Sequence, residues 1–478
     1  MGLTCVIAIT NAAPVEHVVP SEIANCINRL TPVVNTTDAN KVPGLGTPQD
    51  VYLYCLQQFV WRADMVRWED YDITKKDKDF INGLLASMMN STGETNSRNK
   101  RGVTNPPRPA TGFRTRREYR VLNDTERNAF HRVLRTMKTN GEYDRFANLH
   151  RGGVATSAHG GPNFLGWHRV YLVLLEESMR RIDRTVSLPY WDSTLDNEMG
   201  NPANTILFST EFLGNGFGVV TTGPFANWTT SEGQLRRNIN GGSRLVSRNF
   251  INLIMTRCRT RQIARPTATA TYDLELEHGG PHVWVGGQMR GINTAAHDPI
   301  FFLHHAFIDN IWERFRVRQS TVCSPRINPS TDYPPATGEH AQTRSMDGLP
   351  GYRNIDGYRN YWTTTWYRYE PALSCPSCGT TPYITCNTAR NVCVSTERRL
   401  VAQEGAIAGG RLAFSPAETA TSVSAAEAKA LDERLTVGPV FDAPPAEPRT
   451  QRAQLARIAE VARRAGNANP EDDTIVIG

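Results

Sequence analysis

The stretch Asp298-Pro-Ile-Phe-Phe-Leu-His-His-Ala-Phe-Ile-Asp309 decides the fold of this chain. It predicts a helix over residues 298–318, because Asp298 is a natural N-cap and proline is favoured at the first helical position. His304 and His305 follow one another on this helix and point about 100° apart, so both cannot face one ion. Asp309 lies one turn after His305, where it could accept the ring N–H of that imidazole and fix its tautomer.

Histidines gather in two places along the chain, one within residues 150–168 and one within residues 278–305. Imidazole is a ligand for copper, zinc, iron and nickel. Dense groups beside predicted helices are harder to explain by packing than a lone histidine is. The groups therefore indicate a metal site. Their members are His150, His159 and His168, then His278, His282, His297, His304 and His305.

His278 and His282 are four residues apart, which places both on one face of a helix. Gly279, Gly280 and Pro281 between them are poor helix formers, so packing or the metal itself must hold this segment. From these residues alone a histidine-only site for two metals is favoured. A single zinc site, as in a hydrolase, and the absence of any metal remain open.

Three stretches together resemble a known family. Ala158-His-Gly-Gly-Pro-Asn-Phe-Leu-Gly-Trp-His-Arg169 is similar to the first copper motif of tyrosinases and molluscan haemocyanins. Residues 298–309, followed by Trp312, are similar to the second motif, and Leu188-Pro-Tyr-Trp-Asp192 is a further signature. The details most resemble animal, especially molluscan, tyrosinase-like proteins. The resemblance implies a mainly α fold: a tyrosinase-like helical bundle core that holds two copper ions, with irregular, disulfide-stapled flanking segments.

The resemblance also implies which histidines bind the metal. His305 matches the family ligand as the second histidine of its pair, which leaves His304 as a structural neighbour. His150 is preferred to His131 as the first ligand, because His131 lies within a predicted helix where a core or surface role is the default. The ligands of the first copper are then His150, His159 and His168, and those of the second are His278, His282 and His305.

Four positions around this centre affect the chemistry that the family resemblance implies. Ser157 stands where some members carry a cysteine bonded to a ligand imidazole, so no thioether is expected. Gly279 follows the first ligand of the second site, where an asparagine is linked to efficient monophenol hydroxylation. Ile292, thirteen residues before the last ligand, narrows the pocket over the first copper without closing it, and Val283 lines its entrance.

The implied activity is that of a copper-dependent phenol oxidase, a tyrosinase or catechol oxidase. It uses O2 to oxidise o-diphenols to o-quinones, with weaker monophenol hydroxylation. A monophenol also needs a base, for which a water held by Glu275 or Glu277 is the candidate. Melanin formation or quinone cross-linking of a secreted, shell-like matrix, with protein tyrosines among the phenols, would be its use. A haemocyanin-like oxygen carrier and a catalytically weak structural matrix protein are the alternatives.

The chain divides into five segments by composition and punctuation. We expect helices over residues 51–68, 125–138 and 164–182, and long loops over residues 195–270. The segments are a signal peptide truncated at its front (1–13), an N-terminal cysteine-containing segment (14–110), the di-copper core (111–320), a cysteine-rich segment with short strands (321–400) and an Ala/Arg/Glu-rich tail (401–478).

Composition points to export. Fifty-three basic and 47 acidic residues give a mild net charge of +6, which offers no reason to propose nucleic acid or membrane as a partner. Of nine cysteines, Cys5 falls in the predicted signal peptide, and the even remainder favours disulfides and an oxidising compartment. Four N-glycosylation sequons agree with a secreted, extracellular protein. They begin at Asn35, Asn90, Asn123 and Asn227.

Overall fold

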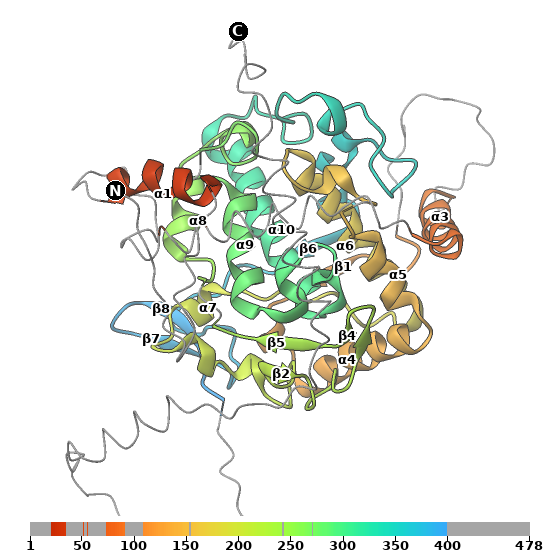
Figure 1. Cartoon of the computed structure of the whole chain (residues 1–478), viewed down its shortest axis with the longest axis vertical. Coiled ribbons are helices and arrows are strands. Elements are labelled where there is room, and N and C mark those ends of the chain that lie inside the picture. The colour runs from red at the N-terminus through yellow and green to blue at the C-terminus, as the bar shows by residue number, and fades with distance from the viewer. Residues whose placement is uncertain are drawn as a thin grey trace, which may run out of the picture. The chain divides into compact units, whose positions relative to one another are not determined.

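Two long helices, α6 (Asn163–Ile182) and α10 (Ile300–Arg318), pack against each other at the centre of the fold. The helix α9 (Leu274–Val285) packs against α10, and α4 (Asp124–Thr139) packs against α6 and against α5 (Glu142–Leu149). Figure 1 shows these helices together, with the short strands around them. The fold is therefore mainly α, as the sequence predicted.

The computed structural model describes residues 21–34, 51, 55, 73–90, 109–152, 154–240, 243–269 and 271–398. These residues fall in one unit, Ser21–Leu400. The predicted signal peptide, the C-terminal tail, the sequon at Asn35 and most of the predicted helix over residues 51–68 lie outside this set. Within the described residues, the other α-helices are α1 (Ser21–Val34), α3 (Lys75–Asn90), α7 (Thr194–Asn197) and α8 (Arg248–Ile254).

The core helices begin and end close to where the sequence predicts. A capping box starts α4, because Asn123 accepts the N–H of Glu126 and the Glu126 side chain accepts the N–H of Asn123. The helix α10 begins at Ile300, two residues later than predicted. Asp298 still accepts the N–H of Ile300 at 3.2 Å, while its two oxygens also pair with Arg237. A tertiary ion pair therefore shares the capping carboxylate.

The helix α9 forms in spite of its Gly-Gly-Pro interior. Asp273 caps it by accepting the N–H of Leu276 at 3.0 Å, and every residue of the helix is buried. A side chain on Gly280 would place its Cβ 2.6 Å from the carbonyl oxygen of Arg244, so only glycine allows this approach of the two backbones. Close packing thus holds a segment whose helix propensity is poor. Packing was one of the two explanations that the sequence offered, the other being the metal.

Within the part of the chain that the structure describes, the strands are short and form four separate two-stranded sheets, β1–β6, β2–β5, β3–β4 and β7–β8. Only the first is parallel, and it joins the start of the core to the cysteine-rich segment. The strands are β1 (Arg114–Arg116), β2 (Phe217–Val219), β3 (Thr229–Thr230), β4 (Gly233–Gln234), β5 (Arg236–Asn238), β6 (Tyr367–Tyr369), β7 (Ile384–Asn387) and β8 (Val392–Ser395). The region predicted as long loops over residues 195–270 thus also contains short strands and α8.

Disulfides staple the periphery. They pair Cys26 with Cys55, Cys258 with Cys323, Cys375 with Cys386, and Cys378 with Cys393. The last two attach the strands β7 and β8 to Cys375 and Cys378, which confirms an irregular, stapled segment with short strands. Within the described ranges, no helix is long and apolar enough to cross a bilayer.

Candidate metal centre

Five structural segments bring six of the eleven histidines together as two triads. His150 ends α5, His159 precedes α6 and His168 lies on α6. In the second triad His278 and His282 come from α9, and His305 comes from α10. Within each triad the candidate ligand atoms all lie within 4.8 Å of one another. Each triad is therefore compact enough to hold one metal ion.

The two triads adjoin. The imidazole rings of His168 and His305 stack with their centroids 4.2 Å apart and their planes 10° apart. All six histidines are at most 3% exposed. Phe164 packs on His278 at a centroid distance of 4.6 Å, and Phe301 packs on His305 at 4.2 Å. The centre is thus a single buried, histidine-lined space with aromatic walls.

Backbone carbonyls set the tautomers of four of these rings. His150 donates from Nδ1 to Ile292 at 3.1 Å, and His282 donates from Nδ1 to Met289 at 2.8 Å. His168 donates in the same way to Phe164 at 2.9 Å, and His278 donates to Glu275. A carbonyl only accepts, so the proton of a neutral ring lies on Nδ1 and its lone pair on Nε2.

Burial keeps the rings neutral. It lowers the pKa of His168 to about 3 and that of His282 to about 4. It also holds the pKa of His150 well below its ordinary value, with a further contribution from His168. Neutral imidazole is the form that binds metal.

The distances between Nε2 atoms test whether a metal fits. His150 and His168 approach each other to 3.2 Å through Nε2, and so do His282 and His305. The Nδ1 atoms of His150 and His168 both carry protons, so these two Nε2 atoms face each other with lone pairs. Such atoms repel unless a cation lies between them. The residues therefore fit a metal ion in each triad, as a set of three neutral imidazoles per ion.

His304 does not join either triad. Its Nε2 donates to the backbone carbonyl of His278 at 2.9 Å, so it connects α10 to α9. His131 is also apart from the triads, because it is buried against Tyr119, to whose hydroxyl it is hydrogen-bonded. The structure thus brings together the six histidines that the sequence singled out, and it separates His304 from His305 as helix geometry predicts.

The predicted role of Asp309 is wrong. Its carboxylate accepts hydrogen bonds from Arg169 at 2.7 Å, from Tyr367 at 2.5 Å and from Tyr369 at 2.7 Å. Nδ1 of His305 has no hydrogen-bond partner among the described residues. Asp309 is drawn away from the ring because two buried arginines, Arg169 and Arg116, need an anion there.

Asp309 belongs to a buried ionic cluster that joins three parts of the fold. Arg116 on β1 also pairs with Glu176 on α6 at 2.8 Å, and Arg169 on α6 also pairs with Glu313 on α10 at 2.8 Å. Burial opposes the charge of Asp309, but Arg169 and Arg116 outweigh it and hold its pKa below the ordinary value. The cluster therefore fixes the relative positions of the two helices that carry His168 and His305.

The remaining predicted positions lie close to the centre in sequence and are buried. Gly279 and Val283 lie on α9 with His278 and His282. Val283 and Ile292 are buried but do not belong to the main hydrophobic core. Ser157 is occupied by a hydrogen bond to its Oγ from Asn163 at 3.0 Å, as suits a position with no thioether.

The structure separates the two glutamates that the sequence left as equals. Glu277 pairs with Arg244 at 2.7 Å. Glu275 instead accepts the N–H of Gly160, next to His159, at 2.5 Å through Oε1, and its Oε2 is buried without a partner among the described residues. Burial raises the pKa of Glu275 to about 7, although Arg265 opposes the shift. Glu275 thus connects α9 to the loop that carries His159.

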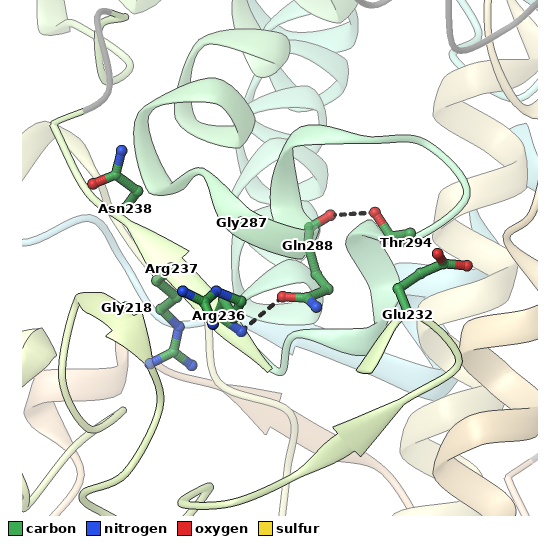
Figure 2. Close-up of a pocket in the computed structure, with 8 residues that line it drawn as sticks. All are labelled: Gly218, Glu232, Arg236, Arg237, Asn238, Gly287, Gln288 and Thr294. Atoms are coloured by element: carbon green, nitrogen blue, oxygen red, sulfur yellow. Dashed lines mark hydrogen bonds between the residues drawn. The ribbon is translucent and has the colours of Figure 1, made fainter. Parts of the chain in front are cut away.

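The orienting carbonyls of Met289 and Ile292 were not predicted. They come from the loop over residues 286–294, and a backbone carbonyl leaves no signal in side-chain type. A pocket of about 470 Å³ adjoins this loop, and none of the six histidines lines it. Gln288, Arg236 and Thr294 are among its lining residues, and Figure 2 shows Gln288 hydrogen-bonded to the other two.

Fold and centre together define a helical protein with two adjoining histidine triads fit for metal. Residues 140–318 match the family model described as the common central domain of tyrosinase. A tyrosinase-like protein of Pinctada maxima is 36% identical over 369 residues, covering 71% of this chain and 78% of that protein. Tyrosinase-like protein 2 of Margaritifera margaritifera is 38% identical over 316 residues, covering 60% and 68%. This chain therefore belongs to the tyrosinase family, whose proteins hold two copper ions.

A solved polyphenol oxidase from Thermothelomyces thermophila aligns with a TM-score of 0.45 and 18% identity. The alignment covers 63% of this chain and 99% of that one.

Proposed function

We propose that the protein is a copper-dependent phenol oxidase whose two ions are held by His150, His159 and His168 and by His278, His282 and His305. The observation that carries the proposal is the pair of adjoining buried triads with Nε2 atoms turned inward. The copper pair, when bound, supplies O2 binding and the oxidation of a phenol. The protein supplies neutral ligands and a space shielded from water.

We assign the proton-handling role in monophenol oxidation to Glu275. Its Oε1 is fixed by Gly160, and its buried Oε2 is available to hold a water against the entering phenol. A base of this kind must lie within hydrogen-bond reach of the hydroxyl whose proton it takes. Glu277 is held by Arg244 and is not assigned this role. Val283 and Ile292 are proposed to line the path by which the phenol reaches the metal centre.

Metal analysis with a catechol assay tests this function. We expect two coppers per chain and O2-dependent conversion of a catechol to its o-quinone. Mass spectrometry of the copper-loaded protein and oxygen uptake are the measurements. One zinc per chain would refute the proposal. Two coppers that bind O2 without turnover would point to an oxygen carrier, and two coppers with neither property would leave a structural matrix protein.

The balance between substrates is expected to depend on Gly279. A catechol needs only access to the metal pair, whereas a monophenol also needs a well-held base, and Gly279 has no side chain to help hold a water. We predict a clear diphenol oxidase with weaker, lag-prone monophenol hydroxylation. Gly279→Asn should raise the ratio of monophenol to diphenol initial rates several-fold.

Gly83→Asn is the matched control, because Gly83 lies on α3 and a Cβ added there would meet nothing within 4 Å. The ratio should stay unchanged in that variant. If the wild-type protein already hydroxylates monophenols efficiently and Gly279→Asn changes nothing, the base is held without help from position 279.

We further propose export, with quinone cross-linking of an extracellular matrix or melanin formation as the use. Eight paired cysteines support an oxidising compartment. Asn123 and Asn227, two sequon asparagines, are exposed. Protein collected from the medium of a secreting cell should lose mass on deglycosylation, and cytosolic retention with reduced cysteines would contradict export.

A further inference from the structure

One loop, residues 286–294, is hydrogen-bonded to one histidine of each triad. Its Met289 carbonyl accepts from Nδ1 of His282 in the second triad, and its Ile292 carbonyl accepts from Nδ1 of His150 in the first. Asn293 adds to the connection with the first triad, since its side chain accepts the N–H of Gly152, just beyond His150, at 2.9 Å. The same short segment therefore sets the orientation of one imidazole on each side of the centre.

Gln288 fixes this loop to the hairpins beside it. Its side chain accepts the N–H of Arg236 at 2.7 Å and donates to the carbonyl of Gln234 at 3.1 Å. Its own carbonyl accepts the hydroxyl of Thr294 at 2.7 Å, which ties one end of the loop to the other. Figure 2 shows the first and last of these bonds. Gln288 is 7% exposed, so both side-chain bonds are largely shielded from water.

The backbone around Gln288 leaves little room for another arrangement. Gly287 has a φ of 55°, and a Cβ there would lie 1.8 Å from the carbonyl oxygen of Arg236. The loop therefore lies directly against β5, with backbone touching backbone. A displacement of the loop from β5 would move the Met289 and Ile292 carbonyls together.

We propose that Gln288 is a positioning residue that couples the two copper sites, holding both triads in their metal-binding form through one loop. The inference rests on the proposed function, since it concerns the ions that the triads are proposed to hold. Gln288 is hydrogen-bonded to Arg236, Gln234 and Thr294 rather than to any of the six histidines. Its effect passes through the carbonyls of Met289 and Ile292, which keep the Nδ1 protons in place and the Nε2 lone pairs turned inward.

Copper release from the full-length, two-copper protein tests this coupling. The protein is mixed with a chelator, and native mass spectrometry follows the species with two, one and no copper. Gln288→Ala should accelerate both steps of release by about tenfold, because outer partners of ligand histidines typically affect metal affinity by 10–100-fold. Gln288→Glu keeps the acceptor for Arg236 and loses the donor to Gln234, so its release should be intermediate.

Gln234→Ala is the matched control, because only the backbone carbonyl of Gln234 is used and that variant retains it. Its release should match the wild type. Thermal unfolding of the copper-free variants verifies that each is folded. If Gln288→Ala does not fold, Gln288→Glu takes its place in the release experiment. Acceleration of one step alone, or release no faster than in Gln234→Ala, would overturn the coupling. A wild-type protein that does not load two coppers would instead refute the proposed function.

Discussion

His305→Ala should leave about one copper per chain and abolish phenol oxidation, whereas His304→Ala should keep two coppers. The two histidines are neighbours on α10, yet only the ring of His305 enters a triad, with Nε2 3.2 Å from that of His282. His304 points to α9 and donates to the carbonyl of His278 at 2.9 Å. A two-metal reaction fails when either ion is missing, so the loss of activity in His305→Ala should be complete.

The His304→Ala variant is the control, because it removes the same type of side chain from the neighbouring position on α10. It leaves a buried carbonyl with one hydrogen bond fewer, which costs about 1–3 kcal/mol of folding free energy without removing a ligand. Copper content by mass spectrometry, diphenol oxidation and thermal unfolding are measured on both variants. A His304→Ala protein that has lost metal beside a His305→Ala protein that has kept it would reverse the ligand assignment.

Asp309→Ala should destabilise the copper-free protein by about 3–5 kcal/mol, the cost typical of removing one partner from a buried ionic pair. The carboxylate is 4% exposed and accepts from Arg169, Tyr367 and Tyr369. Its removal leaves two buried hydroxyls and a guanidinium short of an acceptor. The pKa of Asp309 is lowered in the fold, so its stabilisation is present near neutral pH and is lost as the pH falls through that pKa.

Asp79→Ala is the comparison, because Asp79 forms an exposed pair with Lys75, a pair worth at most about 1 kcal/mol. Denaturant unfolding of both variants measures the difference. The result also separates two roles for Asp309. If the variant loses copper while its unfolding free energy is unchanged, Asp309 acts on His305 directly, and the ionic cluster is not its main task.

The sequence by itself determined the elements that local chemistry encodes. The apolar periodicity over residues 125–138 predicted α4 to within one residue at each end, whereas its capping box at Asn123 and Glu126 is a finding of the structure. The resemblance to the tyrosinase family singled out the six histidines that the fold brings together. Helix spacing placed His278 and His282 on one face, because residues on one helix face keep their relation in any tertiary context. The same argument separated His304 from His305 before any contact was known.

Only the tertiary structure decided which partners the polar groups take. Asp309 has the right helical position to reach His305, but its carboxylate forms ion pairs with Arg116 on β1 and Arg169 on α6 instead. Glu275 and Glu277 look alike in sequence, and the approach of Gly160 to one and Arg244 to the other separates them. The loop carbonyls that orient His150 and His282 are invisible in sequence, because every residue has a carbonyl and long-range packing alone decides where it points.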